Sequence, residues 1–129
     1  MIPAENVKDR LIEKDILGGF RGFVGRKQPS PDEAVTIYDT TGTTPTQYDK
    51  KDERPACQVR VRAGSYDYPA AYKKIKEIRD YLATASFEIS DYNYKTYIQS
   101  EPYFLEYDDK DRPIFTMNIN IIREVIDNE

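Results

Sequence analysis

The chain has 129 residues, the size of one ordinary domain, and its 23 acidic and 19 basic side chains give a net charge of −4. That net negative charge disfavours electrostatic binding to the phosphate backbone of a nucleic acid. No apolar run approaches the ~20 residues that cross a bilayer. The chain has no histidine and one cysteine, Cys57, so it lacks the commonest general base and cannot form an internal disulfide. The first residues show no secretion signal, and we expect synthesis in a reducing cytoplasm with a buried, inert Cys57 thiol.

The first predicted element is an amphipathic helix over residues 4–17, followed by a short strand over residues 20–25. Gly18-Gly19 is expected to end the helix, because glycine readily adopts the left-handed conformation found there. The apolar residues expected on the buried helical face are Ala4, Val7, Leu11, Ile12 and Ile16.

The middle of the chain predicts two strands separated by a long polar loop. After a proline-rich turn at residues 28–32, Val35 and Ile37 alternate with polar neighbours, as in a half-buried strand. Polar residues then dominate to Glu53, a stretch that we expect to become ordered against a partner. The clearest strand covers residues 56–63, where apolar residues alternate strictly with Gln58, Arg60 and Arg62, so that both arginines are expected on a wet face.

The last part predicts one helix and at least two strands. Pro69 starts a helix that carries Tyr72, Ile75, Ile78 and Leu82 at helical spacing. Alternating residues predict a strand over 92–99, a short aromatic run follows at 103–105, and the acidic residues 108–111 predict a turn. The final strand is expected over residues 114–123.

These elements predict an α+β fold, in which an antiparallel or mixed sheet of about four to five strands carries two helices on one face. We expect one domain over residues 1–129, with a long polar loop at about 40–54.

Catalytic and cofactor motifs are not found. The glycines at residues 18–25 follow a helix and match no phosphate-binding pattern, and the carboxylates at 108–111 do not fit a calcium loop. We therefore expect no enzyme activity, no cofactor and no metal. An alternative is a small nucleic-acid-binding domain, in which Arg60 and Arg62 lie beside Tyr92 and Tyr94 on an exposed sheet face.

Four segments of the sequence occur in a recognisable order. They are Val-Thr-Ile-Tyr-Asp at 35–39 with a Thr/Gly loop, Glu-Arg-Pro at 53–55 running into the strand to Arg62, the helix with Tyr72, and Asp-Arg-Pro-Ile-Phe-Thr at 111–116. In this order and spacing they resemble one family, the tail terminators or minor capsid proteins of long-tailed bacteriophages. The resemblance covers most of the chain. The turn at 108–111 lacks the glycine expected before Arg112.

The resemblance implies a structural virion protein made in the bacterial host cytoplasm and placed at the head–tail junction. It implies a ring of identical copies, expected to be a hexamer, that caps the tail tube, ends tail polymerisation and joins the tail to the head connector. The expected partners are other copies, the tail tube protein and the head completion protein, with DNA only passing through and no membrane. We expect assembly contacts from Arg60, Arg62, Thr41, Thr43, Tyr48, Asp49 and Lys50.

Overall fold

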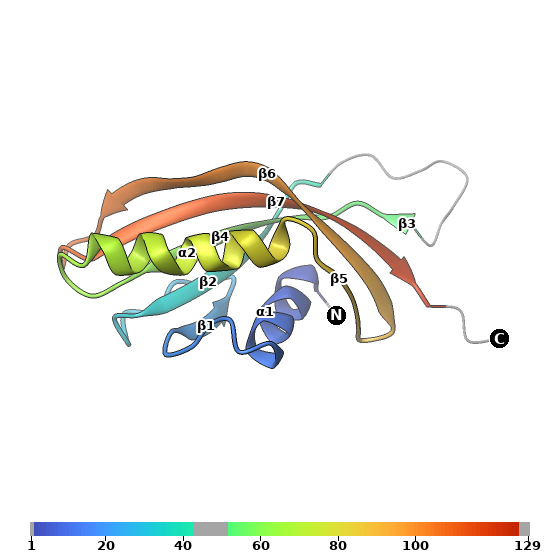
Figure 1. Cartoon of the computed structure of the whole chain (residues 1–129), viewed down its shortest axis with the longest axis horizontal. Coiled ribbons are helices and arrows are strands. Elements are labelled where there is room, and N and C mark those ends of the chain that lie inside the picture. The colour runs from blue at the N-terminus through green and yellow to red at the C-terminus, as the bar shows by residue number, and fades with distance from the viewer. Residues whose placement is uncertain (1, 43–51, 127–129) are drawn as a thin grey trace.

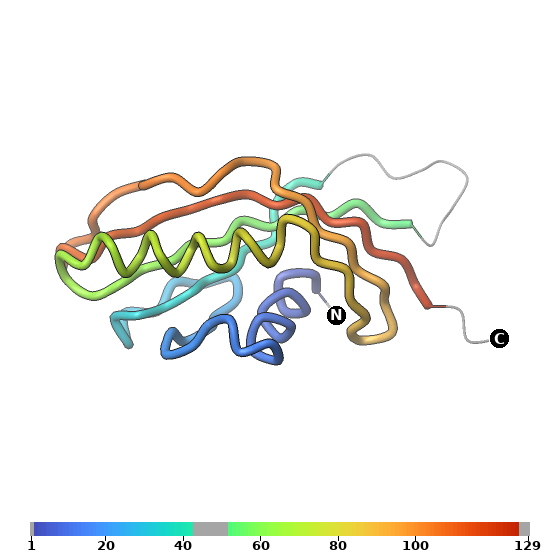
Figure 2. Tube along the Cα trace, viewed as in Figure 1, coloured from blue at the N-terminus to red at the C-terminus, as the bar shows by residue number. Residues whose placement is uncertain are grey.

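The protein is an α+β structure in which two helices cover one face of a strongly curved mixed sheet (Figure 1). The computed structural model describes residues 2–42 and 52–126. The predicted fold class and the placement of both helices on one face are confirmed, but the sheet has seven strands where about four to five were expected. The path of the chain through the layers can be followed in Figure 2.

The strands follow one another across the sheet in the order β1-β2-β4-β7-β6-β5, and β3 pairs with the far end of β7. Only β1 and β2 run parallel; every other pair is antiparallel. The bounds are β1 Arg21–Val24, β2 Ala34–Thr40, β3 Asp52–Glu53, β4 Ala56–Arg62, β5 Ser86–Ile89, β6 Tyr92–Tyr107 and β7 Pro113–Val125.

The core lies between the helices and the sheet. Helix α2, Tyr68–Leu82, presents Ile75, Ile78 and Leu82 to it, as predicted, while Tyr72 remains half exposed. The inward residues of β4 and β7 meet this apolar stripe, so burial of both surfaces holds helix and sheet together.

Helix α1, Pro3–Glu13, is shorter than predicted. It ends in a Schellman motif, in which Asp15 takes the left-handed conformation at φ 56° and the Ile16 amide donates to the Leu11 carbonyl at 2.9 Å. Asp15 therefore closes the helix before the glycine pair is reached. Ile12 is 52% exposed because it lies about 100° around the helix from the buried Leu11, which corrects its predicted place on the buried face.

The last part of the sheet also differs from expectation. The two predicted pieces at 92–99 and 103–105 form one 16-residue strand, β6, whose register against β7 shifts three times between Ile98 and Glu106. The bulges accommodate Pro102 and keep the strand paired on both sides of it. Strand β5 was not predicted, because four residues are too few to show a periodic pattern.

The predicted polar loop at about 40–54 is narrower than expected, because Thr40 belongs to β2 and Asp52–Glu53 form β3. Its two ends meet: a Cβ added to Gly42 would lie 2.0 Å from the Arg54 carbonyl oxygen. Residues 43–51 lie outside the described part of the chain.

Candidate functional site

The sheet face opposite the helices carries most of the polar side chains of β2, β4 and β7, and we call it the outer face. Cross-strand partners point to the same side of a sheet, so Arg60 lies between Thr36 of β2 and Thr116 of β7. The next row places Gln58 between Tyr38 and Asn118. No helix among the described residues packs on this face.

Arg62 lies on the outer face but is 4% exposed, so its predicted place on a wet surface is wrong. The turn before β2 folds over it, and its guanidinium donates from Nε to the Asp32 carbonyl at 3.0 Å and from Nη2 to the Pro31 carbonyl at 2.7 Å. Burial, together with the nearby Arg112, lowers the pKa of Arg62 from its ordinary value. Arg62 therefore holds the turn in place.

A second buried arginine, which sequence reasoning did not single out as functional, holds the same turn. Arg112 donates from Nε to Asp108 at 2.8 Å and from Nη1 to the Pro29 carbonyl at 2.8 Å and to Asp32 at 3.1 Å. These bonds join the β6–β7 turn to the segment before β2. The Asp-Arg-Pro motif at 111–113 thus has a structural role.

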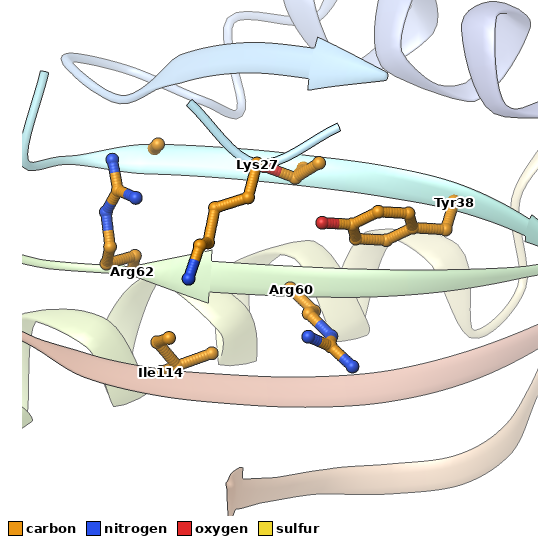
Figure 3. Close-up of a pocket in the computed structure, with 7 residues that line it drawn as sticks. Lys27, Tyr38, Arg60, Arg62 and Ile114 are labelled. Carbon is orange, nitrogen blue, oxygen red and sulfur yellow. The ribbon is translucent and has the colours of Figure 1, made fainter. Parts of the chain in front are cut away.

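Arg60 remains partly exposed and borders a hollow in the outer face (Figure 3). Its Nε donates to Gln58 Oε1 at 3.0 Å, and its guanidinium carbon lies 5.5 Å from the centre of the Tyr38 ring. Lys27 reaches the same place from the loop after β1. We call this the cationic hollow, and its lining includes Lys27, Thr36, Tyr38, Arg60, Arg62 and Ile114.

The tyrosines expected beside the arginines lie elsewhere. Tyr94 is fully buried on the helix side of the sheet, where its hydroxyl accepts from Asn6 at 2.6 Å and from Arg123 at 3.3 Å. The centre of the Tyr92 ring lies 4.2 Å from the guanidinium carbon of Arg123. The proposed stacking platform of Arg60 and Arg62 with these two rings is therefore not formed.

The other candidate assembly residues come from the polar loop. Thr41 is exposed directly after β2. Thr43, Tyr48, Asp49 and Lys50 lie outside the described residues, so their role as assembly contacts stays a prediction.

A further surface, which the sequence did not reveal, lies along the second half of β6. Strand β5 pairs with β6 only at residues 92–95, so beyond Thr96 no described strand pairs with the second edge of β6. Four large side chains with exposures of 37–48% follow this edge: Tyr97, Tyr103, Leu105 and Tyr107. Their repetition in the sequence was the available signal, but the missing neighbour strand was not readable from it. We call this surface the β6 edge.

The described residues contain no group of three or more potential metal ligands, and none of their helices is long and apolar enough to cross a membrane. Cys57 is fully buried, as predicted, and burial raises the pKa of its thiol.

Comparison with known proteins gives one family. The sequence model described as bacteriophage tail terminator protein matches residues 5–125, and a search of curated proteins finds no significant match. The matched region includes every strand and nearly all of both helices. The chain therefore belongs to the bacteriophage tail terminator family, a family of structural tail proteins.

Proposed function

We propose that copies of this chain close into a ring, expected to be a hexamer, that caps the tail tube, ends tube polymerisation and joins the tail to the head connector. Membership of the tail terminator family supports the structural role. The placement at the head–tail junction, the tail tube and head completion proteins as partners, and passage of DNA through the ring are parts of the same proposal.

The observation that carries the proposal is the β6 edge. An exposed strand edge offers unpaired backbone N–H and C=O groups to another chain, and proteins commonly protect such edges with charges or short strands. Here the unpaired stretch is long, and although Pro102 and the register shifts interrupt it, it carries the exposed rings of Tyr97, Tyr103 and Tyr107. Tyrosine is enriched at protein interfaces because its ring is largely apolar and its hydroxyl can remain hydrated.

The two borders of the sheet differ from each other, so the β6 edge of one subunit has a different partner surface at the opposite border. The other border is β1, a four-residue strand with a different sequence that pairs in parallel with β2. A contact between different patches of identical subunits is heterologous, and such contacts generate closed rings when the rotation between subunits closes.

The proposed role requires no chemistry. Buried titratable groups of the described chain have structural roles. Cys57 packs in the core, and Arg112 and Arg123 form ion pairs with Asp108 and Glu53 at 2.8 and 2.9 Å. We propose that the protein is not an enzyme.

The test combines imaging with genetics. The purified protein at high concentration should show rings of about six copies in negative stain. A phage that lacks the gene should produce tails of uncontrolled length and heads without tails, and the wild-type chain supplied from a plasmid should restore plaques. Normal, infectious particles without the gene would overturn the proposal.

A further inference from the structure

The cationic hollow gathers three cations, and one of them, the buried Arg62, is close enough to Asp32 and Asp108 to be affected by their charges. Neither Lys27 nor Arg60 makes an ion pair with any described carboxylate. Arg62 lies two residues from Arg60 on the same face of β4, about 7 Å along the strand. Three cations therefore border one depression in a protein whose net charge is −4.

The nearby acids are already engaged. Asp32 and Asp108 bind Arg112 at 3.1 and 2.8 Å. The free donors of the hollow are the Lys27 ammonium and the Nη atoms of Arg60, with the Tyr38 ring beside them. Like charges held together raise the energy of the isolated subunit, and an incoming anionic oxygen group relieves that cost.

Carboxylates without a described partner gather at the other end of the sheet. Glu88 and Asp91 belong to the β5–β6 hairpin, and Glu124 lies in the same row, because Glu88 and Glu124 both flank Asn93. All three acids are exposed, and none makes an ion pair within the described chain.

The hairpin that carries these acids is held in shape. Ser90 and Asp91 both take positive φ values, of 51° and 66°, in a two-residue turn that matches the twist of paired strands. The Ile126 amide donates to the Asp91 carbonyl at 3.0 Å and attaches the turn to the end of β7. The side chains of Glu88 and Asp91 are therefore presented on a firm support.

We propose that the cationic hollow of one subunit binds the Glu88 and Asp91 carboxylates on the β5–β6 hairpin of a second copy of this chain. The inference rests on the proposed ring and names a contact within it. Hollow and hairpin lie at opposite ends of β7, about 27 Å apart between Thr116 and Glu124, so one subunit cannot join its own two patches. One patch is on a face and the other is at a hairpin tip, so the contact is heterologous and can continue from copy to copy around a ring.

The test reverses charges on each side of the contact. Arg60→Glu and Asp91→Lys should each raise the dissociation constant of self-association by at least about tenfold, because each places like charges against one another. Sedimentation velocity measures this constant. Combined in one chain, the two changes should restore association, since the hollow and the hairpin then attract again with exchanged signs.

A mixture of the two single variants gives a second readout. Arg60→Glu carries acids at both patches and Asp91→Lys carries cations at both, so each variant alone should stay dissociated, whereas the mixture should associate with the two variants in alternation. If the wild-type chain remains monomeric in solution, plaque formation by the phage that lacks the gene replaces sedimentation, with loss in each single variant and recovery in the double variant.

Matched controls exclude a general effect of charge. Lys73→Glu changes an exposed cation of α2, on the other side of the sheet from the hollow, and Asp109→Lys changes an exposed acid at the β6–β7 turn. Both should associate as the wild type does, and thermal melting should show that Arg60→Glu remains folded.

The alternative anions give distinct results. The proposed contact is wrong if Arg60→Glu leaves association unchanged. It is also wrong if the single variants lose association and the double variant does not recover it. Salt-dependent binding of an oligonucleotide or of inorganic phosphate that Arg60→Glu abolishes, with assembly intact, would assign the hollow to phosphate instead. Both outcomes leave the proposed ring standing if the wild-type chain still restores plaques.

Discussion

Asp108 and Arg112 form the most deeply buried ion pair of the described chain, and both side chains are 4% exposed. The Asp108 carboxylate also accepts from the backbone amides of Lys110 and Arg112 at 3.0 Å. Burial works to raise the pKa of Asp108, but these hydrogen bonds and the Arg112 guanidinium outweigh it and hold the pKa below its ordinary value. Through Arg112 this pair, together with Arg62, holds the turn before β2 in position.

Asp108→Asn should lower the free energy of unfolding at pH 7 by about 3 kcal/mol, because it leaves the buried Arg112 without its carboxylate. A carboxyl group with a depressed folded pKa stabilises the fold above its unfolded pKa, near 4, and that contribution is lost as the pH falls through the folded pKa. The free energy of unfolding, measured with urea, should therefore fall less steeply from pH 6 to pH 2 in the variant than in the wild type. Asp109→Asn, at the exposed neighbouring position, is the control; an equal effect there would contradict the assignment.

Gly42 is required by a close approach of two chain segments. Gly42→Ala should destabilise the protein by about 1–3 kcal/mol, since its Cβ would overlap the Arg54 carbonyl oxygen and backbone atoms have little room to move. Gly19→Ala is the matched control, because a Cβ there meets nothing within 4 Å. Thermal or urea unfolding measures both, and equal stability of the two variants would show that the approach is not tight.

At the scale of elements, the polar segment between β2 and β4 joins strands that are already paired up to Thr40 and Ala56. Folding of the sheet therefore does not depend on the residues between Gly42 and Asp52 for register. Their composition, with threonine and alternating charges, predicts a role in contact with a neighbouring protein.

Replacement of residues 43–51 by three glycines should leave the free energy of unfolding unchanged or raise it by up to about 1 kcal/mol, because a shorter loop costs less closure entropy. The same variant should fail to restore plaques to a phage that lacks the gene. A second variant with nine Gly and Ser residues separates the effect of length from that of side chains. Full restoration by both variants would remove the segment from the assembly contacts.

At the scale of the whole molecule, the helices leave the outer face and the β6 edge without cover. The helices of a single copy cover only one face of this sheet, so the surfaces proposed for assembly are the remaining face and the borders. The cationic hollow and the β6 edge belong to these uncovered surfaces.

Tyr103→Lys combined with Leu105→Lys should abolish ring formation while changing the free energy of unfolding by less than about 1 kcal/mol, because both side chains are partly exposed and lysine protects strand edges. Negative-stain imaging and thermal melting provide the two measurements. Ile12→Lys is the control, since Ile12 is 52% exposed on α1. Normal rings from the β6 variant would remove the β6 edge from the interface.

Local patterns were enough to predict much of the fold. The strict alternation in β4 and β7 and the stripe of Ile75, Ile78 and Leu82 each arise from neighbours in the chain, so periodicity reveals them. Arg60 was correctly placed on the outer face for the same reason. Asp15 was missed as a helix end because the left-handed conformation is much less common for aspartate than for glycine, and a glycine pair follows three residues later.

The amino-acid sequence by itself determined the α+β class, the inward residues of the main strands, the buried Cys57 and the resemblance to tail terminators. Only the tertiary structure decided that Arg62 is buried while Arg60 is not, because the carbonyl groups of Pro31 and Asp32 that cover Arg62 lie 31 and 30 residues away in the chain. It also brought Lys27 to the hollow and left the second half of β6 without a partner strand. Periodicity reports which way a side chain points, whereas exposure depends on which distant segment folds over it.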